Sequence, residues 1–270
     1  VRPKKDRSPE TLNVFLVAIA LLVVFQTAFA PNVLFPTAKA SPAVIVASTA
    51  PYAPSDAWVS SLTWLKENSP EPLGSDDVYY QIQPPLQERG VYPYPESAYG
   101  VLAWWDYGYW ITRIAHRIPN ADPSQDSQSI KDVASFFTSQ NETAAAEIRQ
   151  ELGSAYIVID HETALSKFWA IVTWAGKEPY FDSYIVHQNQ TYSQFVFYYP
   201  EYYRSMAVRM FNFDGKAVTP DTILVINYRE VKDPASGQVY KLIEVPADLR
   251  QYTTYQEAED FLSSQTTGNW

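Results

Sequence analysis

The feature that most constrains this chain is an apolar run near its N-terminus. Residues 13–30, NVFLVAIALLVVFQTAFA, contain no charged side chain, and the basic segment VRPKKDR precedes them. A helix rises about 1.5 Å per residue, so a run of this length is just long enough to cross a bilayer. Such a segment either enters a membrane or is removed by cleavage, and the rest of the chain must fold beside it.

Two interpretations of this run remain open. The basic flank, the apolar run and the small residues of AFA or AKA are typical of a cleaved signal peptide. The chain opens with Val1 rather than Met, and a signal peptide does not begin in the middle of a protein, so we favour a membrane-spanning helix. Both interpretations keep the basic flank cytoplasmic and place everything after about Ala30 outside the cytoplasm.

The composition excludes several classes of function. Thirty acidic residues against 20 Lys and Arg give a net charge of -10, which argues against nucleic-acid binding through a basic surface. The sequence has no cysteine, so it contains no disulfide, thiolate zinc site or cysteine nucleophile. Aromatic residues make up 15% of the chain and tyrosine leads with 20, a composition that suits half-wet binding faces.

The chain divides into four predicted regions. A cytoplasmic basic flank covers residues 1–10 and a transmembrane helix residues 11–30. Residues 31–54 are rich in Pro, Ala, Ser and Thr and predict an extended linker. Residues 55–270 form the extracytoplasmic globular domain, with an α/β part over 55–180 and a β-rich part over 181–270.

Hydrophobic periodicity supports this division of the globular domain. Ser55 is a candidate N-cap for a helix that begins at Asp56, and further helices are expected over 129–139, 142–152 and 162–176, with a buried strand over 155–160 between the last two. Beyond residue 180 the pattern alternates. Two strands flank KDPASG, a natural hairpin connection, and helices are expected over 202–211 and 255–265. The expected fold class is therefore α/β to α+β.

The usual catalytic motifs are missing from the sequence. There is no G-x-G-x-x-G, no P-loop and no G-x-S-x-G elbow. The three histidines, His116, His161 and His187, are scattered, which makes a metal site built on paired histidines improbable. We therefore expect neither a metal site nor a catalytic centre within this chain.

The stretch VLAWWDYGYWIT, residues 101–112, crowds aromatic rings around one acid. An ionised Asp106 only accepts hydrogen bonds, whereas the indole N–H groups of Trp104 and Trp105 only donate them. Together they could surround a small hydroxyl and reject a ligand that lacks it. Gly108 permits a positive φ and a sharp turn that would present these side chains. Tyr109 and Trp110 are expected to anchor this turn in the core. An aromatic strand with Asp106 at its turn explains the residues equally well.

A resemblance favours the binding interpretation. Residues 104–108, WWDYG, match the signature of the catalytic subunit of N-oligosaccharyltransferase. The spanning helix, the linker, the helix that ends in WLKENSP and the irregular Tyr- and Pro-rich segment over 78–100 resemble the archaeal type. The resemblance covers essentially the whole chain, as the last transmembrane helix plus the C-terminal globular domain of a multi-pass membrane protein.

A second family pattern, D-x-x-K-x-x-x-[MI], is only partly present. Lys167 and Ile171 occupy the last two positions, but Ala164 stands where the family has Asp. The nearby acids Asp160 and Glu162 are not at the family spacing. Residues four apart lie on one helix face, so Lys167 and Ile171 could contact one ligand. In the family this face helps to hold the Ser or Thr two residues after the glycosylated Asn.

The resemblance implies a function for the chain. The full enzyme transfers an oligosaccharide from a lipid carrier to Asn in Asn-X-Ser/Thr. It uses a divalent metal, Mn or Mg, whose ligands lie outside this segment, so no catalytic residue is expected here. The expected partners are the acceptor polypeptide, the lipid-linked oligosaccharide and the membrane. The residues expected to bind the +2 Ser/Thr are Trp104, Trp105, Asp106, Lys167 and Ile171, with Tyr107 and Gly108 positioning them.

Two alternatives of a different class stay open. The aromatic content also suits a secreted or membrane-anchored carbohydrate-binding module without catalysis. The other alternative is a structural or interaction domain in which the aromatic stretch is part of the hydrophobic core. Full burial of residues 104–106 would favour that last alternative.

Overall fold

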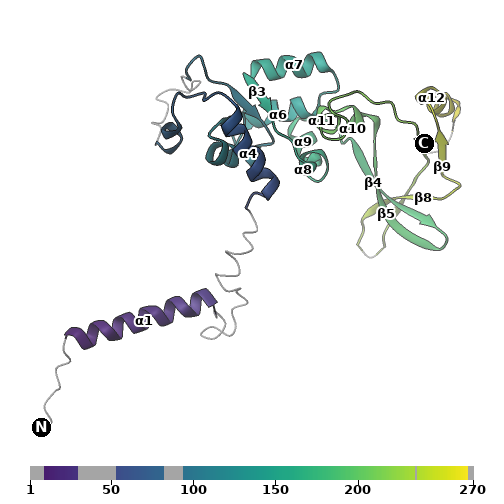
Figure 1. The fold of residues 1–270 in the computed structure, drawn as a ribbon. Helices are drawn as coiled ribbons and strands as arrows, with labels where there is room; N and C mark the ends of the chain where they lie inside the picture. Colours follow the sequence, from purple (N-terminus) through teal and green to yellow (C-terminus); the bar gives the residue numbers. More distant parts are fainter. Residues whose placement is uncertain (1–8, 30–52, 82–93, 235, 267–270) are drawn as a thin grey trace, which may run out of the picture. The chain divides into compact units, whose positions relative to one another are not determined.

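The computed structural model of the chain describes residues 9–29, 53–81, 94–234 and 236–266 (Figure 1). Contacts divide the chain into two compact units, Val1–Val59 and Ser60–Trp270. The predicted linker over 31–54 lies outside the described residues except for its last two positions, as does the middle of the irregular segment over 78–100. The candidate site lies wholly within the second unit.

The apolar run of the first unit forms helix α1, Pro9–Phe29. The helix therefore covers most of the predicted transmembrane segment. The bilayer-crossing role is not confirmed, because within the described part of the chain no helix combines the length and the hydropathy that a membrane span needs.

Short helices and short strands alternate through the remainder of the chain. The α-helices are α4 (Asp56–Asn68), α5 (Gly108–Trp110), α6 (Ser127–Thr138), α7 (Glu142–Glu151), α8 (His161–Ala164), α9 (Phe168–Trp174), α10 (Pro200–Arg204), α11 (Met206–Asn212) and α12 (Tyr255–Ser264). The 3₁₀ and π turns are η1 (Asp76–Tyr80), η2 (Trp105–Tyr107) and η3 (Ile111–Ala115). The strands are β1 (Gly100–Leu102), β2 (Ile118–Pro119), β3 (Ser154–Ile157), β4 (Phe181–Gln188), β5 (Thr191–Tyr198), β6 (Ile223–Ile226), β7 (Arg229–Lys232), β8 (Val239–Glu244) and β9 (Leu249–Tyr252).

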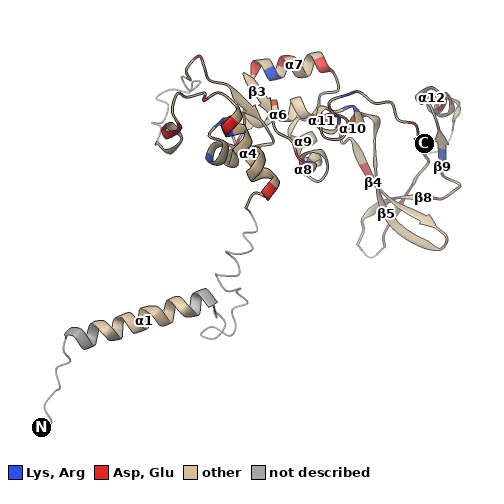
Figure 2. Cartoon of the chain, in the orientation of Figure 1, with Lys and Arg blue, Asp and Glu red and all other residues tan. Residues whose placement is uncertain are grey.

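A small parallel sheet organises the first half of the globular unit. Its order is β2-β1-β3, and both pairings are parallel. The central strand β1 is buried throughout, as expected for a strand with a neighbour on each side. Helices α6 and α9 pack against each other, and α7 contacts both α6 and β3. Helix α7 contains both acidic and basic residues (Figure 2).

The predicted elements of this half are confirmed with one exception. The helices expected over 129–139 and 142–152 correspond to α6 and α7, and the strand expected over 155–160 corresponds to β3, which is only partly buried because Ala155 is exposed. The helix expected over 162–176 is instead two helices, α8 and α9. The break falls at Leu165, whose φ of -120° and ψ of -88° are not helical, and whose side chain is exposed rather than in the predicted apolar stripe.

The second half is built on a mixed four-stranded sheet of order β5-β4-β8-β7. Strands β4 and β5 form a long antiparallel hairpin, and β7 and β8 form the hairpin predicted around KDPASG. Buried Tyr184, Val186 and Ile243 form a small hydrophobic cluster on this sheet. Residues 222–231, expected as one strand, are divided between β6, which pairs with β9, and β7. The mixture of helix and sheet agrees with the expected fold class.

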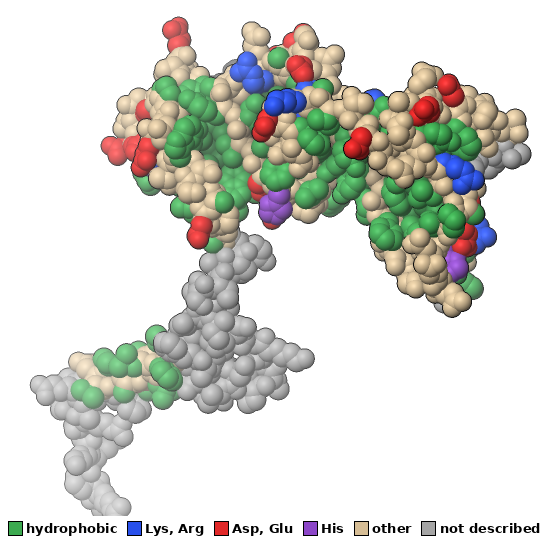
Figure 3. All heavy atoms as spheres, turned by 45° about the vertical axis from the view of Figure 1, so that its right-hand side comes forward, with side chains coloured by type: hydrophobic (Ala, Val, Ile, Leu, Met, Phe, Trp, Pro, Cys, Tyr) green, Lys and Arg blue, Asp and Glu red, His purple; other side chains and the backbone are tan. Residues whose placement is uncertain are grey.

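Strand β5 lies at the edge of its sheet and is unusually exposed. Tyr192, Phe195 and Val196 each keep about half or more of their surface, at 63%, 51% and 46%. On the face drawn in Figure 3, hydrophobic side chains gather in patches among polar ones. Exposed apolar patches of this kind mark surfaces that contact something other than water.

Candidate functional site

The parallel sheet brings two distant segments to one place. Strands β1 and β3 run in the same direction, with Leu102 opposite Ile157. The WWDYG stretch begins two residues after β1, and Asp160 follows β3 by three residues. The carboxyl ends of parallel strands share one edge of a sheet, where ligands of α/β folds commonly bind. Residues 104–108 and 160–171 therefore meet although more than fifty positions separate them in sequence.

The WWDYG stretch forms a tight turn rather than a strand. Trp105, Asp106 and Tyr107 make up η2, and α5 follows directly. Trp104 caps η2 and is 1% exposed, whereas Trp105 and Asp106 are half-buried. The two indole rings lie edge to face, 6.2 Å apart. The stretch is thus part core and part surface, which differs from a wholly buried aromatic strand.

Lys167 joins the two segments through its charge. Its Nζ lies 2.7 Å from Oδ2 of Asp106 and 3.0 Å from Oε2 of Glu162. The same ammonium group stands 4.3 Å from the centre of the Tyr107 ring, within cation–π range. One cation therefore contacts a carboxylate from each segment. The second oxygen of Asp106, Oδ1, accepts no hydrogen bond from the described residues.

Tyr107 ties the turn to the acids that follow β3. Its hydroxyl donates to Oδ2 of Asp160 at 2.7 Å and to Oε2 of Glu162 at 3.3 Å. The other oxygen of Asp160 accepts from the backbone N–H and the hydroxyl of Thr163, both at 2.8 Å, and so caps α8. Thr163 thereby binds one oxygen of Asp160 and Tyr107 binds the other, and this second contact holds the Tyr107 ring beside α8.

The pKa shifts agree with this geometry. Burial alone would lower the pKa of Lys167, but the hydrogen bonds and charges of Asp106 and Glu162 outweigh burial and raise it above its ordinary value. Burial first, and then the hydrogen bond to Asp160, raise the pKa of Tyr107. At neutral pH the site therefore contains a protonated Lys167 and a Tyr107 hydroxyl that remains a donor.

Glu162, rather than residue 164, supplies the second carboxylate that contacts Lys167. Ala164 has no exposed surface, and its carbonyl accepts a hydrogen bond of 2.8 Å from the Tyr202 hydroxyl. A carboxylate at position 164 would point into this core, whereas Glu162 at the surface reaches Lys167. The sequence signal for this role was an acid-rich helix start, DHET, directly after a strand. Spacing alone did not identify it.

Gly108 has a different role from the one predicted. Its φ of -54° and ψ of -44° are helical, so no positive φ is required at this position. A Cβ added here would lie 2.4 Å from Cβ of Asp122 and 2.6 Å from the carbonyl oxygen of Ala121. Glycine is needed because the segment that follows β2 passes directly against it. The left-handed residue lies further on, at His116, with φ of 49° at the end of η3.

Two other aromatic residues exchange their expected places. Tyr109 was expected to anchor the turn, yet it is 52% exposed. Tyr107 is the buried anchor instead, at 2% exposed, and Trp110 packs on it with ring centres 5.4 Å apart. Ile171 has no exposed surface and lies under Lys167 in α9. Its predicted contact with a ligand stays a prediction.

A second polar cluster holds the chain just after the turn. Arg117 is 2% exposed and donates to the carbonyls of Lys66 and Ser69, at 2.9 and 2.6 Å, near the C-terminus of α4. It also pairs with Glu71 at 3.2 Å. A buried cation that satisfies the last carbonyls of a helix fixes that helix end. Arg117 thus connects the end of α4 to β2, the strand that leads to the segment packed against Gly108. No sequence motif predicted this role.

Metal ligation has no evident place in this half. Within the part of the chain that the structure describes, no three His, Cys, Asp or Glu side chains are grouped closely enough to hold an ion. The acids around Lys167 are already engaged with that cation and with Tyr107. The chemistry that the site can perform by itself is recognition of a hydrogen-bond donor at Asp106.

Comparison with known proteins places this geometry among relatives. Residues 55–164 match the family model of the AglB core domain. A dolichyl-phosphooligosaccharide-protein glycotransferase of Archaeoglobus fulgidus is 35% identical over 182 residues, which are 64% of this chain and 20% of the relative. The chain thus spans about a fifth of that relative's length.

Two solved structures of an Archaeoglobus fulgidus oligosaccharyltransferase resemble the fold. One, tethered to an acceptor peptide with an NVT sequon, has a TM-score of 0.53 at 25% identity and covers 93% of this chain and 33% of its own. The other is a complex with Zn and sulfate, with a TM-score of 0.54 at 28% identity. The match covers 79% of this chain and 31% of the solved chain. These matches confirm the resemblance seen in the sequence: the chain is similar to a C-terminal segment of archaeal oligosaccharyltransferases.

Proposed function

We propose that this chain is the acceptor-recognition part of an oligosaccharyltransferase that attaches a lipid-linked oligosaccharide to Asn in Asn-X-Ser/Thr. The observation that carries the proposal is Asp106. It is half-buried, it is held through Oδ2 by Lys167, and its Oδ1 is open to a donor. A Ser or Thr hydroxyl at the +2 position is such a donor, and it would hydrogen-bond to Oδ1.

The surrounding residues define the other roles in the proposal. Trp105, half-exposed beside Asp106, would face the acceptor, and the buried Trp104 would support it from below. Lys167 would hold Asp106 in place through Oδ2. Ile171 would contact the Thr methyl group after a local shift that uncovers it, and one methyl group is worth about 0.8 kcal/mol in favour of Thr.

Glu162 and Asp160 enter the proposal as positioning residues. Glu162 shares the charge of Lys167, and Asp160 holds the Tyr107 hydroxyl. They would do for Lys167 what an acid at position 164 cannot do from inside the core.

Other parts of the proposal rest on the relatives. Dolichyl-phosphooligosaccharide is named as the donor of the Archaeoglobus relative, and we infer a lipid-linked donor for the protein that contains this chain. A Zn complex of the solved relative supports use of a divalent metal, Mn or Mg in our proposal, outside this segment. Association with the cell membrane, with the globular unit outside the cytoplasm, is inferred in the same way.

The test uses the full-length glycotransferase that contains this chain and a peptide with an N-x-T sequon. Asp106→Asn keeps the size of the side chain but removes its charge and its pairing with Lys167. We expect kcat/KM for the peptide to fall at least about tenfold, the consequence of one lost charge-assisted hydrogen bond in a partly buried site.

The matched control is Asp132→Asn, a solvent-facing acid on α6 that hydrogen-bonds only Gln128 among the described residues. It should leave transfer unchanged. Unchanged transfer and unchanged preference for Thr over Ser in Asp106→Asn would refute the proposal.

A further inference from the structure

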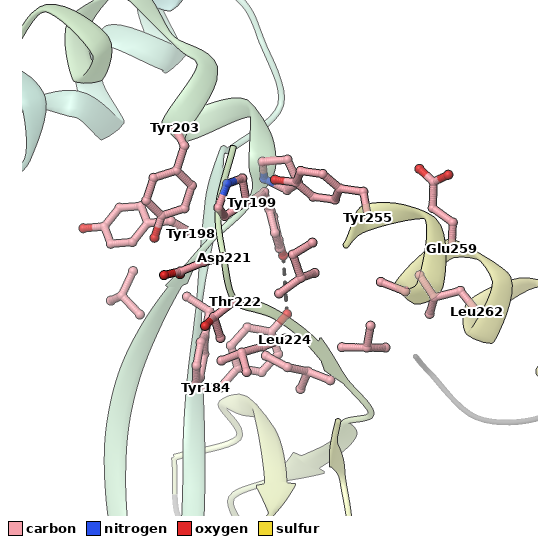
Figure 4. A pocket seen from close by; sticks show the side chains of 18 of the residues that line it. Tyr184, Tyr198, Tyr199, Tyr203, Asp221, Thr222, Leu224, Tyr255, Glu259 and Leu262 are labelled. Carbon is pink, nitrogen blue, oxygen red and sulfur yellow. Dashed lines mark hydrogen bonds between the residues drawn. The ribbon is translucent and has the colours of Figure 1, made fainter. Parts of the chain in front are cut away.

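A large cavity lies away from the WWDYG turn, in the β-rich half of the chain. Its volume is about 750 Å³, within the range of sites that hold small organic ligands. The hairpin of β4 and β5, strand β6 and helix α12 enclose it (Figure 4). None of the residues of the proposed acceptor site lines it.

Tyrosine dominates the lining of this cavity. Tyr198, Tyr199 and Tyr203 come from the end of β5 and from α10, and Figure 4 shows Tyr255 reaching towards them from α12 on the other side. The six tyrosines that line the cavity are Tyr184, Tyr198, Tyr199, Tyr203, Tyr228 and Tyr255. Aromatic faces of this kind pack against the C–H faces of pyranose rings, while each hydroxyl supplies a polar handle.

Several polar tips around the cavity are available to a ligand. The hydroxyls of Tyr198, Tyr203 and Tyr255 make no hydrogen bond to the described residues, and neither does the carboxylate of Asp221 or the hydroxyl of Thr222. The hydroxyls of Tyr184 and Tyr199, by contrast, hydrogen-bond to each other at an oxygen–oxygen distance of 3.4 Å. A hydroxyl both donates and accepts, and a carboxylate accepts. The cavity therefore offers hydrogen bonds in both directions.

The pKa shifts keep these hydroxyls in the donor form. Burial, together with the charges of Tyr198 and Tyr255, raises the pKa of Tyr203 above its ordinary value. Burial also raises the pKa of Tyr255. Both side chains are therefore protonated at neutral pH and can donate to a ligand oxygen.

The charges around the cavity restrict the ligand further. Among the described residues that line it there is no Lys, Arg or His, and Asp221 and Glu259 are acidic. Two cations lie against the rings of lining tyrosines: Lys241, which pairs with Asp182, is 4.9 Å from the centre of the Tyr228 ring, and Arg204 is 5.0 Å from the centre of the Tyr255 ring. Asp221 and Glu259 would repel a phosphate or another anion, whereas a neutral ligand meets no such repulsion.

From these observations we propose that the tyrosine-lined cavity is a binding site for a neutral saccharide. The ring faces stack on the apolar side of a pyranose, and the open tips of Tyr203, Tyr255 and Asp221 bind its hydroxyls. A proline-rich peptide can also dock on an aromatic-lined groove, and the test below separates that outcome from saccharide binding. The site would hold one or two sugar units.

The test titrates the 270-residue chain with methyl β-glucopyranoside, methyl α-mannopyranoside and cellobiose, followed by saturation-transfer NMR. At least one of them should bind with a Kd on the order of 1 mM. Tyr203→Ala and Tyr255→Ala should each weaken that binding about tenfold, since each removes a stacking face. Tyr203→Phe, which keeps the ring, should weaken it about threefold through the lost hydroxyl.

The control is Tyr192→Ala, which removes a tyrosine that is 63% exposed on the same hairpin but outside the cavity lining. It should leave saccharide binding unchanged. Binding that survives both alanine variants, or no saturable binding of any of the three saccharides, would overturn the proposal. So would saturable binding of an extended proline- and lysine-containing peptide that is lost in Tyr203→Phe, because it would assign the cavity to polypeptide.

Discussion

At the scale of single residues, the site depends on how Lys167 divides one positive charge. Asp106 alone would form a closed pair with it and leave little reason for a ligand to approach. The ammonium group also contacts Glu162 and lies 4.3 Å from the centre of the Tyr107 ring, so three groups fix its position. Lys167 thereby holds Oδ2 of Asp106, while Oδ1 stays open to a donor.

Replacing Glu162 by Gln tests this division of charge. The change removes one of the two carboxylates that raise the pKa of Lys167, so that pKa should fall, which NMR of the Lys167 side chain measures directly. Since the folded pKa lies above the unfolded value of 10.5, these contacts stabilise the fold fully below pH 10.5 and lose their effect as pH rises through the folded value. In the full-length enzyme, KM for the acceptor peptide should rise about two- to fivefold with kcat little changed.

Glu147→Gln, on the exposed face of α7, is the matched control and should change neither quantity. An unchanged Lys167 pKa in Glu162→Gln would contradict the division of charge itself. A lowered Lys167 pKa with an unchanged KM for the acceptor peptide would mean that the Glu162–Lys167 ion pair is structural only. Glu162 would then have no part in acceptor recognition.

At the scale of elements, the decisive contact is the one between α5 and the segment after β2. The backbone at Ala121 and Asp122 passes so close to Gly108 that no side chain fits between them. This contact sets the angle at which η2 leaves the sheet, and hence the direction in which Asp106 points.

Gly108→Ala should therefore destabilise the protein although its backbone is helical, where Ala is normally preferred. The added Cβ meets backbone atoms at 2.6 Å, which must move apart, at a cost of about 1–3 kcal/mol in the free energy of unfolding. Urea denaturation of the chain measures the loss. Gly153→Ala provides the comparison, because nothing lies within 4 Å of its Cβ position and only the positive φ of 60° opposes the change.

A loss of about 1 kcal/mol in Gly153→Ala and a larger one in Gly108→Ala would fit this account. Equal or reversed losses would mean that the close approach at Gly108 relaxes without cost.

The elements also show how far the sequence could lead. Periodicity located α6, α7, β3, the β7–β8 hairpin and α12, because each has a clear apolar pattern and a cap or turn of its own. It joined α8 and α9 into one helix because Leu165 fits the apolar spacing, and no local signal shows that its backbone leaves the helical region. That break is what brings Lys167 to the cap of α9, so the detail of the site was the part that tertiary contacts decided.

At the scale of the whole globular unit, the packing has two centres. Val101, Ile111, Phe137 and Phe168 are fully buried in the parallel-sheet half, and Tyr184, Val186 and Ile243 form the cluster of the β-rich half. Hydrophobic alternation predicted both halves, but it could not predict that β6 and β7 would separate into different sheets, since that depends on which partner strands are near.

Ile243→Ala tests whether the two centres unfold together. The side chain is fully buried, so its truncation should lower the free energy of unfolding by about 2–4 kcal/mol. We expect amide hydrogen exchange to accelerate in β4 and β8, with β1 and β3 little changed. Ile171→Val, a smaller truncation in the other centre, should give the opposite distribution, and equal acceleration in both halves would show one cooperative unit instead.

The parallel pairing of β1 with β3 has a consequence for how the protein comes into use during synthesis. Asp106 leaves the ribosome well before Lys167, and the two meet only when β3 has docked beside β1. Until that moment the chain carries an acid without its partner. In our proposal, a chain that ends before residue 167 would lack the cation that holds Asp106, and selection of the acceptor would begin only when the sheet is complete.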